Sequence, residues 1–278
     1  MNKKGYWFIN IPFFVWIGLF IIYPLALVVY NSFLITENGN TSFSLYNYLR
    51  ITDPLYLKII VRSLWLAFLA TLICLIISYP AALVLASKSM RNNPIWLIML
   101  LIPMWMNFLL RTYSLLTLFE NTGVINSILE HLGFEGISFL YNENAVVLGM
   151  VLNMFPYMLF PIYTSISKIG TDIIEAGRDL GANDWICLKR IIFPLSVKGI
   201  ISGVTMVFVP SVTAFAISKL LGGGMVPLVG DIIEQQFRAV GDWNFGSALS
   251  TMVMIIVLIC MWCVNRWSDT QEVAGSIW

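Results

Sequence analysis

The sequence predicts an all-α integral membrane protein with six transmembrane helices, and three observations carry this prediction. The 278 residues are 59% hydrophobic and only 11% charged, with a mean hydropathy of +0.83. Soluble domains carry about 25% charged residues, so a soluble fold is excluded. Six uncharged stretches reach or approach the roughly 20 helical residues that span a bilayer. The basic residues between these stretches are distributed unevenly, which orients the helices.

The six stretches are residues 5–36, 63–87, 92–110, 144–167, 199–218 and 243–265. The first follows Lys3 and Lys4, as a signal sequence would, but it is too long and no small-residue cleavage site follows it. We therefore expect an uncleaved first helix with Pro24 near its end. Because no repeat and no low-complexity linker divides the chain, we expect one domain over residues 1–278.

Basic residues are concentrated in the loops on one side of the membrane. With a cytoplasmic N-terminus, ten of the 16 basic residues lie inside, five lie outside and one lies within the third span. The inside set is Lys3, Lys4, Lys88, Arg91, Lys168, Arg178, Lys189, Arg190, Lys198 and Arg266; the outside set is Arg50, Lys58, Arg62, Lys219 and Arg238. This pattern predicts a multi-pass protein of the cytoplasmic membrane with both termini in the cytoplasm.

The outer loops contain two predicted short helices. Residues 125–132 have the apolar periodicity of a helix in the membrane interface. The glycines at 222–224 permit a reversal before an amphipathic helix over 228–237. Three acids of this last loop either attract a cationic substrate or are simply solvated, and we favour the solvated interpretation; they are Asp231, Glu234 and Asp242.

Residues 170–194 form the longest strongly charged passage of the chain, and they lie on the cytoplasmic side between two apolar stretches. Thr171 or Asp172 is expected to cap a helix whose first turn holds Glu175, where a carboxylate favours the positive helix end. Gly181 is expected to end this helix, because glycine readily adopts the left-handed conformation.

A second short helix is expected after Gly181. Asn183 or Asp184 would cap it, Lys189 and Arg190 would lie in its last turn, and Pro194 would end it. Two short helices at an angle would make a projection on the cytoplasmic membrane surface.

The first of these helices has one polar face, since Glu175, Arg178 and Asp179 are spaced at i, i+3 and i+4. Gly177 within it costs about 1 kcal/mol relative to alanine, which suggests that another backbone approaches closely. Such a projection is either a docking element for a partner or an ordinary solvated helix-turn-helix loop.

Residues for catalysis or metal binding are not apparent. The four cysteines, Cys74, Cys187, Cys260 and Cys263, lack a second CxxC pair, and His131 is the only histidine, so we expect packing cysteines and no metal site. The chain has no Walker A pattern and no hydrolase constellation. We therefore expect neither an enzyme nor an ATP-binding chain.

Polar residues within the predicted spans are candidates for a translocation path. Arg111 either reaches the membrane surface with its long side chain or serves a path or gate. The candidates are Trp105, Asn107, Arg111 and Tyr113 around the third span, Asn153 and Tyr157 in the fourth, and Ser211 and Thr213 in the fifth. Interface belts explain the aromatic residues equally well, and kinks at Pro156 and Pro210 explain the others.

Residues 170–194 resemble the E-A-A…G…I-x-L-P signature of permease subunits of ATP-binding-cassette (ABC) importers. The matching residues are Glu175, Ala176, Gly181, Ile191 and Pro194. Gly177 stands in place of the second alanine and Phe193 in place of the leucine, and neither change removes a charge or the central glycine. In this family the matching region is the coupling helix, which fits a groove on the ATP-binding subunit, so the resemblance implies coupling roles for Glu175, Ala176, Gly177, Arg178, Asp179 and Gly181.

Further segments resemble the permeases of spermidine/putrescine importers. They include residues 53–56, 62–64, 78–80, 107–113, 178–182, 236–237 and 242–246. The resemblance implies a type I ABC importer permease fold and transport of polyamines. It also implies a second related permease, two copies of an ATPase that binds ATP and Mg, and an external substrate-binding protein, with no cofactor in this chain and no nucleic acid.

Three alternatives remain open. The first is a permease of the same family for another small solute, because relatives with other solutes share these segments. A secondary transporter driven by an ion gradient would need buried ionisable residues near the midplane, and the predicted spans hold almost none. A structural membrane subunit without a path is the third alternative, and the importer signature argues against it.

Overall fold

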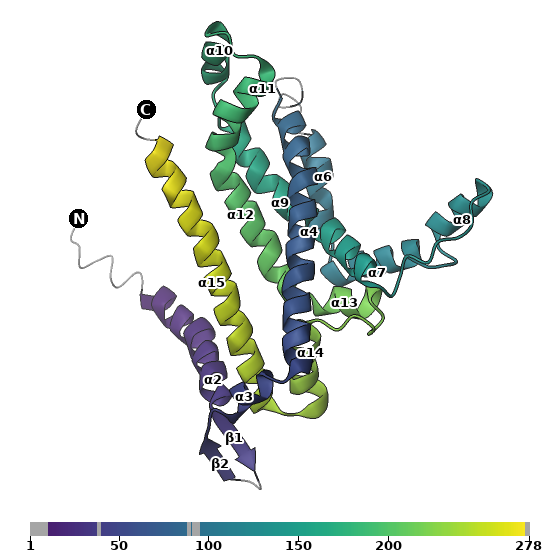
Figure 1. The fold of residues 1–278 in the computed structure, drawn as a ribbon, viewed down its shortest axis with the longest axis vertical. Helices are drawn as coiled ribbons and strands as arrows, with labels where there is room; N and C mark the ends of the chain where they lie inside the picture. Colours follow the sequence, from purple (N-terminus) through teal and green to yellow (C-terminus); the bar gives the residue numbers. More distant parts are fainter. Residues whose placement is uncertain (1–10, 38–39, 88–89, 91–94, 276–278) are drawn as a thin grey trace. The chain divides into compact units, whose positions relative to one another are not determined.

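Figure 1 shows the fold of the chain in a computed structural model, which describes residues 11–37, 40–87, 90 and 95–275. Its helices and strands, after an initial helical segment from Ile11, are η1 (Gly18–Ile22), α2 (Tyr23–Ser32), β1 (Leu34–Glu37), β2 (Asn40–Phe43), α3 (Tyr46–Ile51), α4 (Pro54–Ala86), α6 (Ile95–Trp105), α7 (Phe108–Phe119), α8 (Val124–His131), α9 (Glu143–Ser167), α10 (Thr171–Asp179), α11 (Asp184–Cys187), η2 (Leu188–Ile192), α12 (Phe193–Val212), α13 (Phe215–Leu221), α14 (Val229–Gln235), η3 (Gln236–Val240) and α15 (Trp243–Gly275). Parts of two predicted spans, residues 5–10 and 92–94, lie outside the described residues, as do Lys3, Lys4, Lys88 and Arg91 of the predicted inside set.

Five helices of the described chain are long and apolar enough to cross a membrane: Ile11–Ser32, Pro54–Ala86, Glu143–Ser167, Asp184–Val212 and Trp243–Val264. A sixth span results if Ile95–Trp105 and Phe108–His131, which are bent by 97° at the break between them, count as one. The predicted set of six apolar spans is therefore present, with its third member broken.

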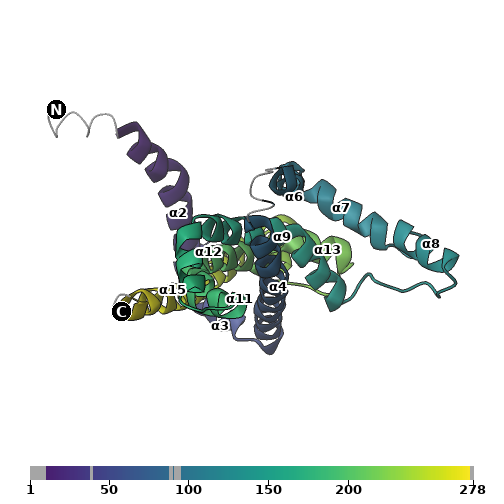
Figure 2. The same cartoon turned by 90° about the horizontal axis from the view of Figure 1, so that it is seen from above.

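The break changes the interpretation of the third span, which the sequence predicts as one helix over 92–110. Pro103 lies in the last turns of α6, and Asn107 caps α7 by accepting hydrogen bonds from the backbone N–H of Leu109 and Leu110 at 2.9 and 3.4 Å. A proline near a helix end and an asparagine in the capping position both favour a new helix start. In Figure 2 α6 is seen nearly end-on while α7 runs across the picture.

Four other predicted span boundaries are wrong. The first helix ends at Ser32, and Leu34–Glu37 pairs as an antiparallel strand with Asn40–Phe43 instead of continuing a helix to residue 36. The fifth span ends at Val212, and Phe215–Leu221 forms the separate helix α13. The second and last helices are longer than predicted, because α4 begins at Pro54 and α15 continues to Gly275.

The described residues fall into two compact units, and the first combines residues 1–58 with 232–258. Within it, Arg50 Nη1 lies 2.8 Å from Asp242 Oδ2, and its guanidinium carbon lies 4.0 Å from the centre of the Phe245 ring. Asp242 also caps α15, because its Oδ1 accepts a hydrogen bond from the Phe245 N–H at 3.1 Å. These contacts join α3 to the start of α15.

The second unit combines residues 59–231 with 259–278, and its core surrounds α9. Two-thirds of the most apolar stretch of α9 is buried, against 22% for the helix that contains α12. The two helices pack closely, because a Cβ at Gly203 would lie 2.8 Å from Met158 Sδ, and one at Gly199 would lie 2.7 Å from the Pro161 carbonyl oxygen. Small residues at these positions let the backbones approach, as is common between membrane helices.

The short outer helices are present where the sequence predicts them. The helix α8 covers most of residues 125–132, and α14 with η3 covers most of 228–237. The solvated interpretation of Asp231 is wrong, since this residue is only 8% exposed and its Oδ2 accepts a hydrogen bond from the Leu228 N–H at 2.8 Å. The prediction of one domain stays a prediction.

Candidate functional site

The sequence correctly predicts the end of α10, the first helix of the charged passage, but not the residue that caps its start. Gly170 is its N-cap, without a side-chain capping bond, so the predicted capping by Thr171 or Asp172 is wrong and Glu175 lies in the second turn. The end follows the prediction: Gly181 has φ +84°.

The turn at Gly181 is held by two backbone hydrogen bonds. The Gly181 N–H donates to the Arg178 carbonyl at 2.8 Å, and the Ala182 N–H donates to the Gly177 carbonyl at 3.0 Å. This pair of bonds is the Schellman motif, which satisfies carbonyls that the helix end would leave open. The motif fixes the direction in which the chain leaves α10.

The second helix of the passage does not stop at Pro194, contrary to the prediction. Asn183 caps α11 as expected, with its Oδ1 2.9 Å from the Ile186 N–H. The chain then passes through the π-turn η2 into α12, so that Asp184–Val212 is one continuous helix. Proline is tolerated at the first positions after such a turn because it has no N–H to satisfy there.

Gly177 has an internal explanation. A Cβ at this position would lie 2.6 Å from Ile191 Cδ1 and 3.7 Å from Cys187 Sγ, so the close neighbour is a side chain of the following helix. The suggested approach of a foreign backbone is therefore not needed to explain this glycine. The ion pair between Arg178 Nη2 and Asp184 Oδ1, at 2.8 Å, also joins α10 to α11, but both groups are more than half exposed and the pair contributes little.

The surface of this projection, which we call the knob (residues 170–187), carries large apolar side chains that reasoning from charges missed. Leu180 is 90% exposed and Trp185 is 69% exposed, and Ile173 is also exposed. Exposed Trp and Leu beside charged residues are typical of a protein contact, because aromatic anchors dominate binding energy. The signal in the sequence was a tryptophan within the longest strongly charged passage of the chain.

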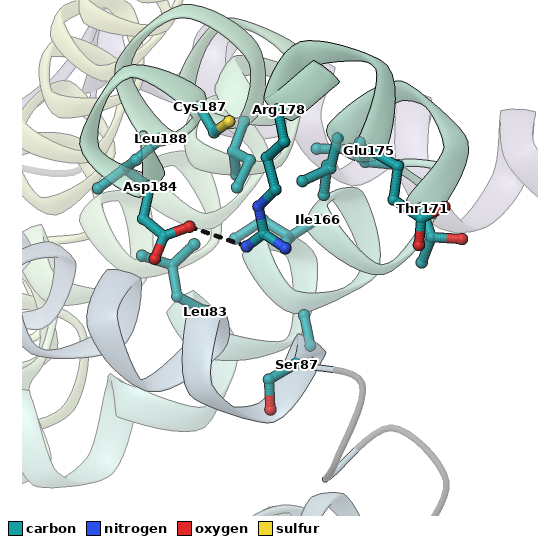
Figure 3. A pocket seen from close by; sticks show the side chains of 13 residues that line it. Leu83, Ser87, Ile166, Thr171, Glu175, Arg178, Asp184, Cys187 and Leu188 are labelled. Carbon is teal, nitrogen blue, oxygen red and sulfur yellow. Dashed lines mark hydrogen bonds and ion pairs between the residues drawn. The ribbon is translucent and has the colours of Figure 1, made fainter. Parts of the chain in front are cut away.

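A pocket of about 420 Å³ lies between the knob and the ends of α4 and α9 (Figure 3). Glu175 and Arg178 of α10 line one side, and Leu83 and Ser87 of α4 line the opposite side. Of the predicted coupling residues, Glu175 and Arg178 therefore face this pocket in part, while Ala176 and Asp179 are exposed on the surface of the knob.

The predicted cysteine roles hold for two of the four residues. Cys74 and Cys187 are buried and Cys260 is half-buried, but Cys263 is exposed on α15, so packing within this chain does not account for it. The described residues contain no group of three or more His, Cys, Asp or Glu side chains placed to hold a metal ion.

Among the path candidates, the structure brings Arg111 and Asn153 together. Arg111 Nε donates to Asn153 Oδ1 at 2.7 Å, and Arg111 Nη1 donates to the Pro103 carbonyl at 2.8 Å. Arg111 is 8% exposed, so it does not reach out to the membrane surface. Asn153 is fully buried, and its Nδ2 donates to the Gly149 carbonyl within α9 at 2.9 Å.

The other path candidates do not form one cluster. Ser211 is fully buried near the end of α12, and its Oγ makes no hydrogen bond within the described part of the chain. Tyr157 is half-buried against the core. The remaining four are exposed, namely Trp105, Asn107, Tyr113 and Thr213. Path lining by these residues stays a prediction.

Comparison with known proteins gives consistent relatives. Residues 5–271 match the family described as "Binding-protein-dependent transport system inner membrane component". The spermidine/putrescine transport system permease protein PotB of Escherichia coli strain K12 is 37% identical over 259 residues, which are 90% of this chain and 94% of that protein. The PotB of Haemophilus influenzae is 34% identical over 261 residues, which are 91% of each chain.

Solved structures share the fold at low sequence identity. A chain of the bacterial alginate ABC transporter, solved with its alginate pentasaccharide-bound periplasmic protein, superposes with a TM-score of 0.79 at 14% identity and covers 96% of this chain and 94% of its own. A chain of the inward-facing methionine ABC transporter MetNI gives 0.61 at 15% identity, over 80% of this chain and 98% of its own.

These structures confirm the predicted fold class, an all-α membrane fold of the type I ABC importer permeases. The family match covers nearly the whole chain, from before the first described helix to Gln271 in the last turns of α15. This chain is thus a multi-pass inner-membrane permease that belongs to the family of inner-membrane components of binding-protein-dependent transport systems.

Proposed function

We propose that this chain is the polyamine-translocating permease subunit of an ABC importer. The observation that carries the proposal is the 37% identity to PotB, which extends over 90% of this chain and is not confined to the knob. The relative's name gives spermidine and putrescine as its solutes. We extend these solutes to this chain because similarity of this extent covers both the spans and the loops.

The proposed assembly contains a second related permease, two ATP-binding subunits and an external binding protein that delivers the polyamine. ATP and Mg would bind to the ATP-binding subunits, and this chain would hold no cofactor and catalyse no hydrolysis. The absence of a Walker A pattern from the sequence supports this division of labour. Both termini and the knob would lie in the cytoplasm, where an ATPase can reach them.

The knob would be the docking element for the ATPase. Glu175, Ala176, Arg178 and Asp179 would supply its polar contacts, with Gly177 and Gly181 shaping the helix and its end. The continuous helix Asp184–Val212 supports this role. Since α11, η2 and α12 form one continuous helix, a displacement of the knob would be passed directly to the membrane span.

Transport would then follow from a movement of the spans. Closure of the ATPase subunits on ATP would shift the knob, and the spans would open the path toward the cytoplasm. Asn153 and Ser211 are fully buried within this chain, so such a path would be lined by the exposed candidates, which are Trp105, Asn107, Tyr113 and Thr213.

The test is ATP-dependent uptake of labelled spermidine by cells in which this chain is deleted and redundant polyamine carriers have been removed. We expect uptake to disappear on deletion and to return when the chain is restored. Uptake that persists without the chain would disprove the polyamine assignment. Uptake that collapses with the proton gradient but survives ATP depletion would instead identify an ion-driven transporter.

A further inference from the structure

We infer that Arg111 is a positioning residue for transport, which holds the bend between α6 and α7 against α9. The inference rests on the proposed function, because it concerns how a translocating permease keeps its broken span in place. Its basis is the meeting of three elements at one guanidinium group: the end of α6, the first turn of α7 and the middle of α9.

Arg111 hydrogen-bonds to Pro103 on one side and to Asn153 on the other, and we call these three residues the clasp. Pro103 lies two residues before the end of α6, and its carbonyl accepts only a long backbone hydrogen bond, from the Met106 N–H at 3.3 Å. Arg111 Nη1 donates to this carbonyl at 2.8 Å from across the break. Because the C-terminal end of a helix carries partial negative charge, a cation is stabilised at this position.

The other half of the clasp reaches into the core. Arg111 Nε lies 2.7 Å from Asn153 Oδ1, and Asn153 is held in turn by the Gly149 carbonyl of its own helix. Since α9 is the most buried of the long apolar helices, this hydrogen bond fixes the start of α7 to the packed core of the second unit.

The side-chain chemistry requires arginine. A guanidinium group presents several N–H donors in a rigid plane, so Nε and Nη1 can serve two acceptors in different directions at once. A lysine ammonium group is a compact charge on a flexible stem and does not reproduce this fork. Lysine would therefore keep the charge but lose the clasp.

The charge also argues against direct binding of the solute by Arg111. Both acceptors of the guanidinium group that the structure describes are neutral, so its positive charge is retained. A polyamine is a polycation and would be repelled from this site. Arg111 thus acts on transport through the position of α7 and not through contact with the solute.

The experiment uses the complete transporter, reconstituted with its partner subunits in proteoliposomes. Arg111→Lys and Asn153→Leu each remove the clasp, and each should lower the maximal rate of spermidine uptake about tenfold or more, with the KM for the loaded binding protein unchanged. Asn153→Asp keeps an acceptor for Arg111 but loses the donor to the Gly149 carbonyl, so its uptake should lie clearly above that of Asn153→Leu, and equal uptake by the two variants would contradict the clasp.

The matched control is Thr112→Val. Thr112 is the buried neighbour of Arg111 on α7, and its hydroxyl group donates only within its own helix, to the Phe108 carbonyl at 2.9 Å. This nearly isosteric change perturbs the buried face of α7 without touching the clasp, and uptake should stay at the wild-type rate. An equal loss in the control would show that any disturbance of α7 is sufficient, which overturns the clasp.

A second measurement needs no solute. The melting temperatures of the purified assembly carrying Arg111→Lys, Asn153→Leu and both changes form a double-mutant cycle, and we expect clear non-additivity because the two side chains share one hydrogen bond. Additive shifts would overturn the clasp even if wild-type uptake is normal. Non-additive shifts without wild-type spermidine uptake would leave the clasp in place and disprove the polyamine assignment.

If the transporter carrying Arg111→Lys does not assemble, the double variant Arg111→Lys with Asn153→Asp tests the link between α7 and α9. A lysine can pair with an aspartate at this position, so the combination should recover assembly and part of the uptake. Failure of the combination to assemble better than Arg111→Lys alone would contradict a link between α7 and α9 at this point.

Discussion

Replacing Gly181 by alanine should weaken docking of the ATPase through the backbone alone. Gly181 has φ +84°, and a Cβ at this position would meet no atom of the chain within 4 Å. The substitution therefore creates no clash within the chain. Its cost arises because an L-residue is strained in the left-handed conformation, by about 1–2 kcal/mol.

The expected magnitude follows from the stability of α10. The unfolded chain has fewer backbone conformations with alanine than with glycine, and this offsets about 0.4–1 kcal/mol of the strain. The net cost in folding free energy is then about 1 kcal/mol. The helix has nine residues and none of them is buried, and helices of this length are marginal by themselves. A cost of about 1 kcal/mol then lowers the ordered fraction, and with it the apparent affinity for the ATPase, by up to about fivefold.

The assay is a titration of the ATP-binding subunit against the membrane subunits in lipid nanodiscs. Gly133 supplies the matched control, because it has φ +82° and equally open surroundings but lies after α8, outside the knob. Gly133→Ala should leave the affinity unchanged. Gly181→Asn should bind more tightly than Gly181→Ala, because asparagine tolerates the left-handed conformation better.

Two results would refute this reasoning. One is an affinity of Gly181→Ala equal to wild type, which would mean that the turn does not matter for docking. The other is an equal loss for Gly181→Ala and Gly133→Ala, which would trace the effect to general destabilisation. An affinity of Gly181→Asn below that of Gly181→Ala would point to a steric clash with the ATPase instead of backbone strain.

The remaining predictions concern the knob surface and the helix packing. Trp185→Ala should lower the affinity for the ATPase about 30-fold, which corresponds to about 2 kcal/mol for an aromatic anchor. The melting temperature of the isolated membrane subunits should not change, because Trp185 is 69% exposed. An affinity within threefold of wild type would exclude Trp185 as an anchor. Gly203→Leu should lower the free energy of unfolding in detergent by about 1–3 kcal/mol or more, because the new Cβ would lie 2.8 Å from Met158 Sδ. Gly18→Leu, at a glycine with no atom within 4 Å of its Cβ position, is the control, and equal losses at both sites would contradict the packing argument.

The sequence predicts the helices of this fold well because their signal is local. A stretch of about 20 apolar residues must be helical in a bilayer, since only internal hydrogen bonds satisfy its backbone there. The same holds for the helix end at Gly181 and the capping residue Asn183, whose effects depend on their immediate neighbours. The motif in residues 170–194 needed no tertiary information, because its glycine and charges act within two helical turns.

The wrong predictions involve residues whose partners lie elsewhere or whose local signals compete. Pro194 predicts a helix end in isolation, but the π-turn before it lets one helix run from Asp184 to Val212. Gly177 suggests contact with a foreign backbone, whereas Ile191 of the following helix occupies the space beside it. The sequence does not show which neighbour, if any, fills the space beside a glycine.

The sequence by itself determined that this protein spans the membrane, that its charged passage is a helical projection, and which family signature that passage carries. These properties depend on composition and on contacts within a few residues. Only the tertiary structure decided that Arg111 is buried, because its acceptors, Pro103 and Asn153, are 8 and 42 residues away along the chain. It also decided that Leu180 and Trp185 are exposed on the knob. Burial is a property of the packed helices, and no local pattern specifies which neighbour will cover a side chain.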